Sequence, residues 1–115
     1  MDIHIHRILQ RGVITEGYLT IDGNRICDTL ENTNYCLPPG TYNITLTNFP
    51  FARSNGIHHL SRKRNPPPKP TKGITSVGTR ACMGCIIRTG QAYQTLYERI
   101  KKSLQRKNQI QLIIQ

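Results

Sequence analysis

Two alternating segments, Tyr18-Leu19-Thr20-Ile21 and Arg25-Ile26-Cys27-Asp28-Thr29-Leu30, flank the sequence Asp22-Gly23-Asn24. An Asp-Gly pair between two such segments is among the strongest short-range signals of a β-hairpin, because the tight turn needs positive φ angles that these two residues tolerate. Residues 18–30 therefore predict a hairpin, and with it a fold that begins from antiparallel strands.

Further strands are predicted on both sides of this hairpin. Ile3, Ile5 and Ile8 recur among polar residues and indicate an opening strand with one buried face. Residues 37–40 form a Pro- and Gly-containing turn, and the strict alternation of residues 41–47 predicts the strand that follows it. Residues 74–77 and 85–88 are candidate short strands around a glycine-containing turn.

The period of the apolar residues changes near the C-terminus. Helical spacing relates Ala92, Tyr93, Leu96, Tyr97, Ile100 and Leu104. Residues 109–114 then return to β character. The prediction is a mainly β (α+β) fold: a small β sandwich or barrel-like sheet, one C-terminal amphipathic helix at about 91–106, and a closing C-terminal strand. With 115 residues the chain predicts a single domain, 1–115, because it is too short for two independent cores.

Residues 49–72 break every periodicity and are predicted to form a basic, proline-rich loop or insertion. Residues 65–70 read Asn-Pro-Pro-Pro-Lys-Pro, which favours extended or polyproline-II backbone because proline lacks an N–H donor and excludes helix before it. A long irregular segment inside a compact domain often marks a functional element.

Charge is distributed unevenly between the two halves of the chain. Residues 1–51 carry three basic and five acidic residues, a net charge of −2, whereas residues 52–115 carry thirteen basic residues and only Glu98, a net charge of +12. Such asymmetry indicates either an anionic partner for the second half or a solvated basic surface that aids solubility.

No apolar run approaches the roughly 20 residues that a membrane span needs. The opening residues alternate between apolar and polar, unlike the continuous apolar stretch of a signal peptide. The expected location is therefore cytoplasmic, unless a separate route releases the protein.

Cys27, Cys36, Cys82 and Cys85 are expected to be free thiols, because nothing in the chain signals export. Two alternatives stay open for the Cys-x-x-Cys pair at 82–85: a redox pair, or half of a four-thiolate zinc site completed by Cys27 and Cys36. His4 and His6 share one strand face and could together bind a metal, although a solvated strand face is the commoner arrangement. No metal or cofactor is predicted.

The run Gly84-Cys85-Ile86-Ile87-Arg88, followed by the helical segment with Leu96-Tyr97 and a final strand, is similar to the end of L,D-transpeptidase catalytic domains. The chain resembles more closely a phage and bacterial domain of unknown function, through its hairpin, its Thr29-Leu30-Glu31 and its Pro39-Gly40-Thr41-Tyr42. These stretches together span roughly two thirds of the chain.

This resemblance implies a β-rich fold and a degenerate active site that acts on peptidoglycan peptide amides. Cys85 would be the nucleophile and Gly84 part of the turn whose N–H groups stabilise an oxyanion, with Arg80 and Arg88 favouring the thiolate. The family places Ser or Thr and then His before the Gly-Cys pair, where this chain has Cys82 and Met83.

The histidine that the family carries upstream is also missing, and residues 75–77 stand in its place. His59, in the His58-His59 pair, is therefore the candidate general base.

Two functions follow from these residues. The first is a degenerate L,D-transpeptidase-like protein, either a cysteine acyl transferase or hydrolase or an inactive pseudoenzyme that binds peptidoglycan or another anionic polymer, with release by a phage lysis or virion route. The second is a non-catalytic basic module that contacts nucleic acid non-specifically, or a protein partner, through residues 53–72. The candidate anion-binding residues are Arg53, Arg62, Lys63, Arg64, Lys69 and Lys72.

Overall fold

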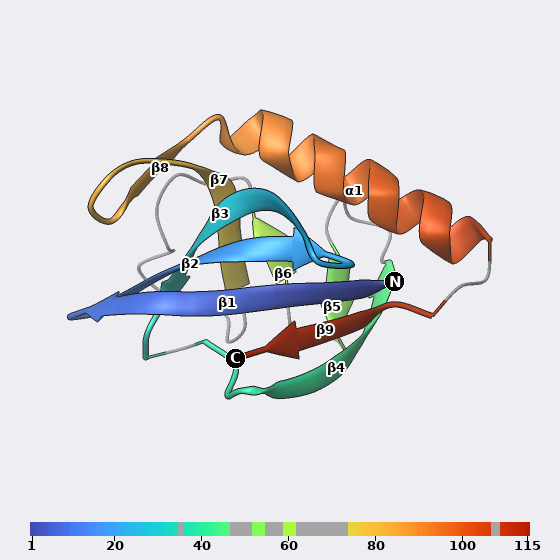
Figure 1. Ribbon diagram of the computed structural model, residues 1–115, viewed down its shortest axis with the longest axis horizontal. Helices are drawn as coiled ribbons and strands as arrows, with labels where there is room; N and C mark the ends of the chain where they lie inside the picture. Colours follow the sequence, from blue (N-terminus) through green and yellow to red (C-terminus); the bar gives the residue numbers. More distant parts are fainter. Residues whose placement is uncertain (35, 47–51, 55–58, 62–73, 107–108) are drawn as a thin grey trace.

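The computed structural model describes residues 1–115 apart from 35, 47–51, 55–58, 62–73 and 107–108. Nine strands and one helix are assigned in this described part of the chain. They are β1 (Asp2–Arg11), β2 (Ile14–Ile21), β3 (Asn24–Asn32), β4 (Gly40–Leu46), β5 (Ala52–Ser54), β6 (His59–Ser61), β7 (Ile74–Cys82), β8 (Cys85–Ile87), α1 (Thr89–Gln105) and β9 (Gln111–Ile114). The mainly β fold, with a helix near the C-terminus and a final strand, is confirmed (Figure 1).

The strands form one mixed open sheet in the order β5-β4-β9-β1-β2-β3-β7-β6, and β8 pairs separately with β7. The sheet is curved. β5 and β6, near its two ends, lie behind β1 and β2 in Figure 1 and contact each other. Of the two predicted arrangements, this curved single sheet corresponds to the barrel-like one.

The predicted hairpin is the β2–β3 pair. Ile21 lies opposite Asn24, and the two turn residues between them both have positive φ, 49° at Asp22 and 87° at Gly23. This backbone is the one for which an Asp-Gly pair is selected. Asp22 also fixes the start of β1, because the Asp2 N–H donates to Asp22 Oδ1 at 2.8 Å and the Asp22 N–H donates to the Asp2 carbonyl at 2.9 Å.

The opening strand is present, but its predicted buried face is only partly right. Ile3 and Ile5 are fully buried, whereas 65% of Ile8 is exposed. Ile8 lies three residues after Ile5, so the two-residue period of a strand already places it on the face opposite to Ile3 and Ile5. It is also the extra residue of a bulge, because Arg7 pairs with Gly17 and Leu9 with Glu16.

The two ends of the chain meet in the middle of the sheet. β9 lies between β1, to which it is parallel, and β4, to which it is antiparallel (Figure 1). This pairing buries Leu112 and Ile114 beside Ile3 and Ile5. The predicted closing strand is therefore confirmed, although its partners could not be identified from the sequence.

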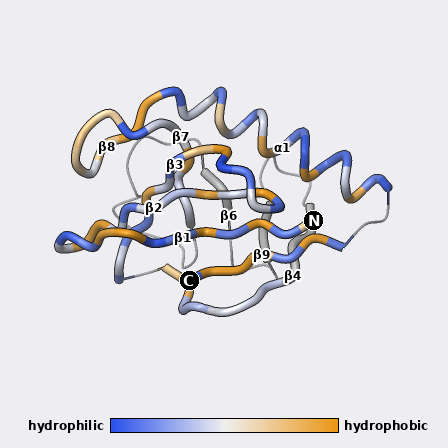
Figure 2. The backbone as a smooth tube through the Cα atoms, in the orientation of Figure 1, coloured by the Kyte–Doolittle hydropathy of each residue, from blue (hydrophilic) through white to orange (hydrophobic). Residues whose placement is uncertain are grey.

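The helix α1 covers the inner face of the sheet. It begins at Thr89, two residues before the predicted start, directly after Arg88 in a left-handed conformation with φ of 54°. Tyr93, Leu96 and Ile100 are its buried residues, and Figure 2 shows hydrophobic and hydrophilic segments alternating along it. They belong to one core with apolar residues of β1, β2, β3, β7 and β9. No helix within the described residues has the length and apolar character of a membrane span.

Two predictions for the middle of the chain need correction. The segment 49–72, expected to lack regular structure, contains β5 and β6, both of three residues, while much of the remainder lies outside the described residues. The strand expected at 74–77 continues to Cys82. Both differences have the same physical reason. Short or irregular strands are stabilised by pairing with distant segments, and a periodic pattern in their own sequence does not mark them.

Gly17 is a point of close approach between β1 and β2. A Cβ atom there would clash with the His6 carbonyl oxygen and lie 3.1 Å from the Arg7 Cα. Both contacts are to backbone, which cannot rotate away. We expect Gly17→Ala to lower the free energy of unfolding by about 1–3 kcal/mol, the usual cost of overpacking, in urea denaturation.

Gly12 supplies the control for this prediction. Gly12 has a φ of 55°, but no atom lies within 4 Å of the position that a Cβ would occupy there, and asparagine tolerates this backbone. Gly12→Asn should therefore stay close to the wild type in urea denaturation. Equal urea midpoints for Gly17→Ala and the wild type would contradict the close approach.

Candidate functional site

Cys85 lies at the tip of the β7–β8 hairpin, directly opposite Cys82 across the turn Met83-Gly84. Gly84 has a φ of 70°, a conformation that glycine adopts readily. Cys82 is exposed and Cys85 is half-buried. A side-chain hydrogen bond to Cys85 raises the pKa of the Cys82 thiol, and desolvation adds to this effect. The two thiols therefore form one unit at the turn.

Glu16 holds this turn in place from β2. The Gly84 N–H donates to Glu16 Oε1 at 3.0 Å, and Arg80 Nε donates to the same oxygen at 2.9 Å. Only 7% of the Glu16 side chain is exposed, and its Oε2 atom is buried without a hydrogen-bond partner in the described structure. The hydrogen bonds from Arg80 and from the Gly84 backbone lower the pKa of Glu16.

This arrangement changes the interpretation of two sequence-predicted groups. The cysteine-nucleophile hypothesis uses the Gly84 N–H for an oxyanion and Arg80 for a Cys85 thiolate, but both donate to Glu16. Sequence reasoning did not identify Glu16. In the sequence, Glu16 is an acidic residue before Gly17 in a segment that could form a strand. This pattern does not distinguish a buried carboxylate from a solvated one.

The structure does not bring the backbone of His59 close to Cys85 along the sheet. His59 pairs with Ile74 at the start of β7, whereas Cys85 pairs with Cys82 at the end of β7. His58 lies outside the described residues. Thr75, Ser76 and Val77, where the resemblance would place a histidine, are fully buried within the sheet.

The other two cysteines lie elsewhere. Cys27 is buried in the core, and this burial raises its pKa to about 12. Cys36 donates to the Thr33 carbonyl at 3.4 Å, and desolvation raises its pKa as well. No group of three or more possible metal ligands occurs among the described residues. The four-thiolate arrangement is therefore not formed by Cys27, Cys36 and the Cys82–Cys85 pair in this fold.

His4 and His6 take part in a stack on the outer face of the sheet. Their ring centroids are 5.4 Å apart, and the His6 ring stacks on Tyr18 at 4.6 Å. The Arg25 guanidinium lies over the ring of Tyr18, at 4.5 Å from its centroid. His6 Nε2 is also within hydrogen-bond distance of Thr20 Oγ1, at 3.3 Å. The alternation of these residues thus places them in a cross-strand stack.

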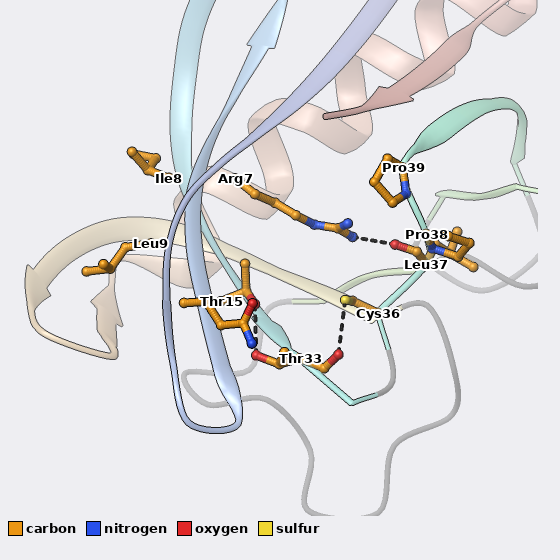
Figure 3. A pocket seen from close by; sticks show the side chains of 10 residues that line it. Arg7, Ile8, Leu9, Thr15, Thr33, Cys36, Leu37, Pro38 and Pro39 are labelled. Carbon is orange, nitrogen blue, oxygen red and sulfur yellow. Dashed lines mark hydrogen bonds between the residues drawn. The ribbon is translucent and has the colours of Figure 1, made fainter.

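A cavity of about 590 Å³ opens between the end of β1 and the turn before β4 (Figure 3). Its polar side chains include Arg7, Thr15, Thr33 and Cys36, and apolar residues including Leu37 complete the lining. In Figure 3 Arg7 points across the cavity to the Leu37 carbonyl, and Cys36 points to Thr33. Cys85 does not line this cavity.

The wall of this cavity contains a buried ion pair. Arg7 Nε donates to Glu31 Oε2 at 2.8 Å, and Arg7 Nη2 donates to Glu31 Oε1 at 2.9 Å and to the Leu37 carbonyl at 2.7 Å. Thr75 Oγ1 donates to Glu31 Oε1 at 3.3 Å. Glu31, the acid of the Thr-Leu-Glu stretch, is 1% exposed, and each of its carboxylate oxygens accepts a hydrogen bond.

The predicted anion-binding residues lie mostly outside the described part of the chain. Arg53 belongs to β5, while Arg62, Lys63, Arg64, Lys69 and Lys72 fall in the range 62–73. The structure describes a second group of cations, to which the sequence analysis assigned no binding role. Arg99, Lys101, Lys102 and Arg106 are exposed on the second half of α1 and just after it.

Three of these cations surround a depression of about 350 Å³. It is lined by Met1, Asp22, Arg99, Lys102, Ser103 and Arg106. Arg99, Lys102 and Arg106 follow helical spacing and so share one face. The N-terminal ammonium of Met1 lies here too and donates to the Gln109 carbonyl at 3.2 Å. Within the described residues, none of the three side chains forms an ion pair.

The comparisons with known proteins do not assign this chain to a family. No family model matches it, and neither a curated protein nor a solved structure is found to match. The resemblance to L,D-transpeptidases therefore stays a prediction that rests on short motifs, and the site has to be interpreted from its own geometry.

The buried pair of Arg7 and Glu31 can be tested by unfolding. Arg7→Ala leaves a nearly inaccessible carboxylate without its cation, and we expect a loss of about 3–5 kcal/mol in the free energy of unfolding. The double variant Arg7→Met/Glu31→Leu removes both charges and should recover part of that loss. A loss for Arg7→Ala of the size found at exposed pairs, below about 1 kcal/mol, would contradict the burial.

Glu16 should produce an acid-dependent loss of stability. Its pKa in the folded protein lies below the ordinary value of 4.5, so its contribution is complete above that value and is lost as the pH falls through the lower, folded-state pKa. Urea midpoints should therefore be measured from about pH 6 to about pH 3, a range that includes the ordinary glutamate pKa of 4.5. Over this range the midpoint should fall more steeply for the wild type than for Glu16→Gln. Parallel curves would show that the ionised Glu16 contributes nothing.

Proposed function

We propose that this protein is a non-catalytic, basic binding module that contacts the phosphate backbone of nucleic acid through the second half of α1. The observation that carries the proposal is the group of three cations around the depression beside the N-terminus: Arg99, Lys102 and Arg106. These side chains have no acidic partner among the described residues, so their charge faces solvent.

The charge of this face is not offset by its neighbours. Lys101 adds a further exposed cation on the same stretch of helix, and Glu98 is the one acidic residue of α1. Asp22 lines the depression, but its Oδ1 atom accepts the Asp2 N–H. Clustered lysines and arginines attract phosphates and gain affinity by releasing counterions from the nucleic acid.

Some of these cations have a structural role as well. Positive side chains near a helix C-terminus offset the helix dipole, and each is worth about 0.3–1 kcal/mol at an exposed position. Dipole compensation needs one or two cations in the last turn, whereas Arg99 lies nearly two turns before the end of α1. A continuous stripe of cations is better explained by an extended anionic ligand.

The geometry at Cys85 favours this proposal over acyl transfer. A cysteine nucleophile needs a base and an unoccupied oxyanion donor. The Gly84 N–H is bound to the Glu16 carboxylate, which also places negative charge near the thiols.

The proposal is tested by fluorescence anisotropy with a labelled oligonucleotide of mixed sequence, single-stranded and duplex, between about 50 and 200 mM salt. The wild type should bind both forms with an affinity that falls steeply with salt. Arg99→Gln/Lys102→Gln should weaken binding at least about tenfold at low salt and reduce the slope of log K against log salt by about 2.

Arg11→Gln/Arg25→Gln is the matched control, because it changes the net charge by the same amount and neither residue lines the depression beside α1. It should leave the affinity and the salt slope close to those of the wild type. If both double variants weaken binding equally, the protein responds to net charge alone and the α1 surface is not the site. Binding that is indifferent to salt would also reject the proposal.

A further inference from the structure

The β7–β8 hairpin carries a pair of cysteines that the proposed function does not use. Cys82 and Cys85 are direct partners in the antiparallel register, one on each side of the two-residue turn. Directly opposite residues of an antiparallel pair have Cα atoms about 4.5–5.5 Å apart, which falls within the range of about 4.4–6.8 Å that a disulfide needs. The backbone therefore already holds the two cysteines at bridging distance.

We propose that Cys82 and Cys85 form a redox-active dithiol, which peroxide or a small-molecule disulfide converts reversibly into an intramolecular disulfide across the hairpin turn. The proposal does not depend on nucleic-acid binding. It also differs from a thioredoxin-type pair, which lies at the start of a helix, because both cysteines here are strand residues.

Cys82 is the one exposed thiol among the four cysteines, all of which the structure describes. Cys82 is exposed and Cys85 is half-buried, so an oxidant can reach the hairpin tip from solvent. Cys27 is 8% exposed inside the core, and the Cys36 thiol is held by the Thr33 carbonyl. Oxidation should therefore be selective for the hairpin.

The turn itself is suited to a reversible bond. Glu16 holds the Gly84 amide from outside the hairpin and is itself held by Arg80, and these contacts involve neither sulfur atom. Closing the disulfide therefore requires no exchange of hydrogen-bond partners at the turn.

The chemistry balances with peroxide as the oxidant. One sulfur of the pair, as its thiolate, attacks a peroxide oxygen, the O–O bond breaks, and a sulfenic acid and hydroxide form. The second sulfur then attacks the sulfenic sulfur, the S–S bond forms and water leaves. Two thiols and one hydrogen peroxide thus give one disulfide and two waters, and a dithiol reductant reverses the reaction.

The full-length protein, fully reduced and then treated with dilute hydrogen peroxide, tests the proposal. Of its four thiols, two should become resistant to alkylation while the intact mass falls by two hydrogen atoms. Peptide mapping without reduction should place the bond between residues 82 and 85, and dithiothreitol should restore all four thiols. Mapping on the wild type makes this result independent of whether a variant folds.

Single variants separate the pair from the other cysteines. Cys82→Ser and Cys85→Ser should lose the intramolecular product entirely and give a sulfenic acid or a linked dimer instead, whereas Cys36→Ser should oxidise like the wild type. A bridge that includes Cys36 would overturn the proposal. Four thiols that stay alkylatable at peroxide concentrations that oxidise free cysteine would overturn it as well.

Discussion

The buried ion pair of Arg7 and Glu31 is the interaction on which the arrangement of this sheet depends. It joins β1 to β3 across β2. Arg7 also holds the Leu37 carbonyl, and Glu31 accepts a hydrogen bond from Thr75 of β7. These partners compensate a carboxylate that is only 1% exposed to solvent. β1, β3, the turn before β4 and β7 therefore share one polar contact.

A second buried carboxylate plays the same part at the other hairpin. Glu16 of β2 binds Arg80 and the Gly84 amide, and so attaches the β7–β8 hairpin to the sheet. This attachment decides what Cys85 can do. The acyl-transfer hypothesis uses the N–H groups of the Gly84 turn as oxyanion donors, but the Gly84 N–H is bound to Glu16. What remains at the tip is a pair of neighbouring thiols, which is suited to redox chemistry rather than to acyl transfer.

The charge asymmetry of the chain has a structural explanation in these contacts. Four carboxylates of the acidic half, those of Glu16, Asp22, Asp28 and Glu31, are bound to specific donors. These carboxylates accept hydrogen bonds that connect strands and turns. In the described part of the chain, the cations around the α1 depression form no ion pair with an acidic residue. The positive face of the helix is the surface on which the proposed polyanion would bind.

The sequence by itself determined the local elements of this protein. Asp22-Gly23 specifies its hairpin turn because the turn needs positive φ angles, and the spacing of Tyr93, Leu96 and Ile100 specifies one buried face of a helix. The position of β9 between β1 and β4, the bulge at Ile8 and the short strands β5 and β6 were decided only by tertiary structure. The same holds for the candidate site: Cys85 and Gly84 could be selected from their motif, but Glu16, which occupies the Gly84 amide, could not. The local sequence pattern around a residue indicates its backbone conformation and the face on which its side chain lies. Its partner depends on the register between strands that are many residues apart, and the packing of the whole sheet sets that register.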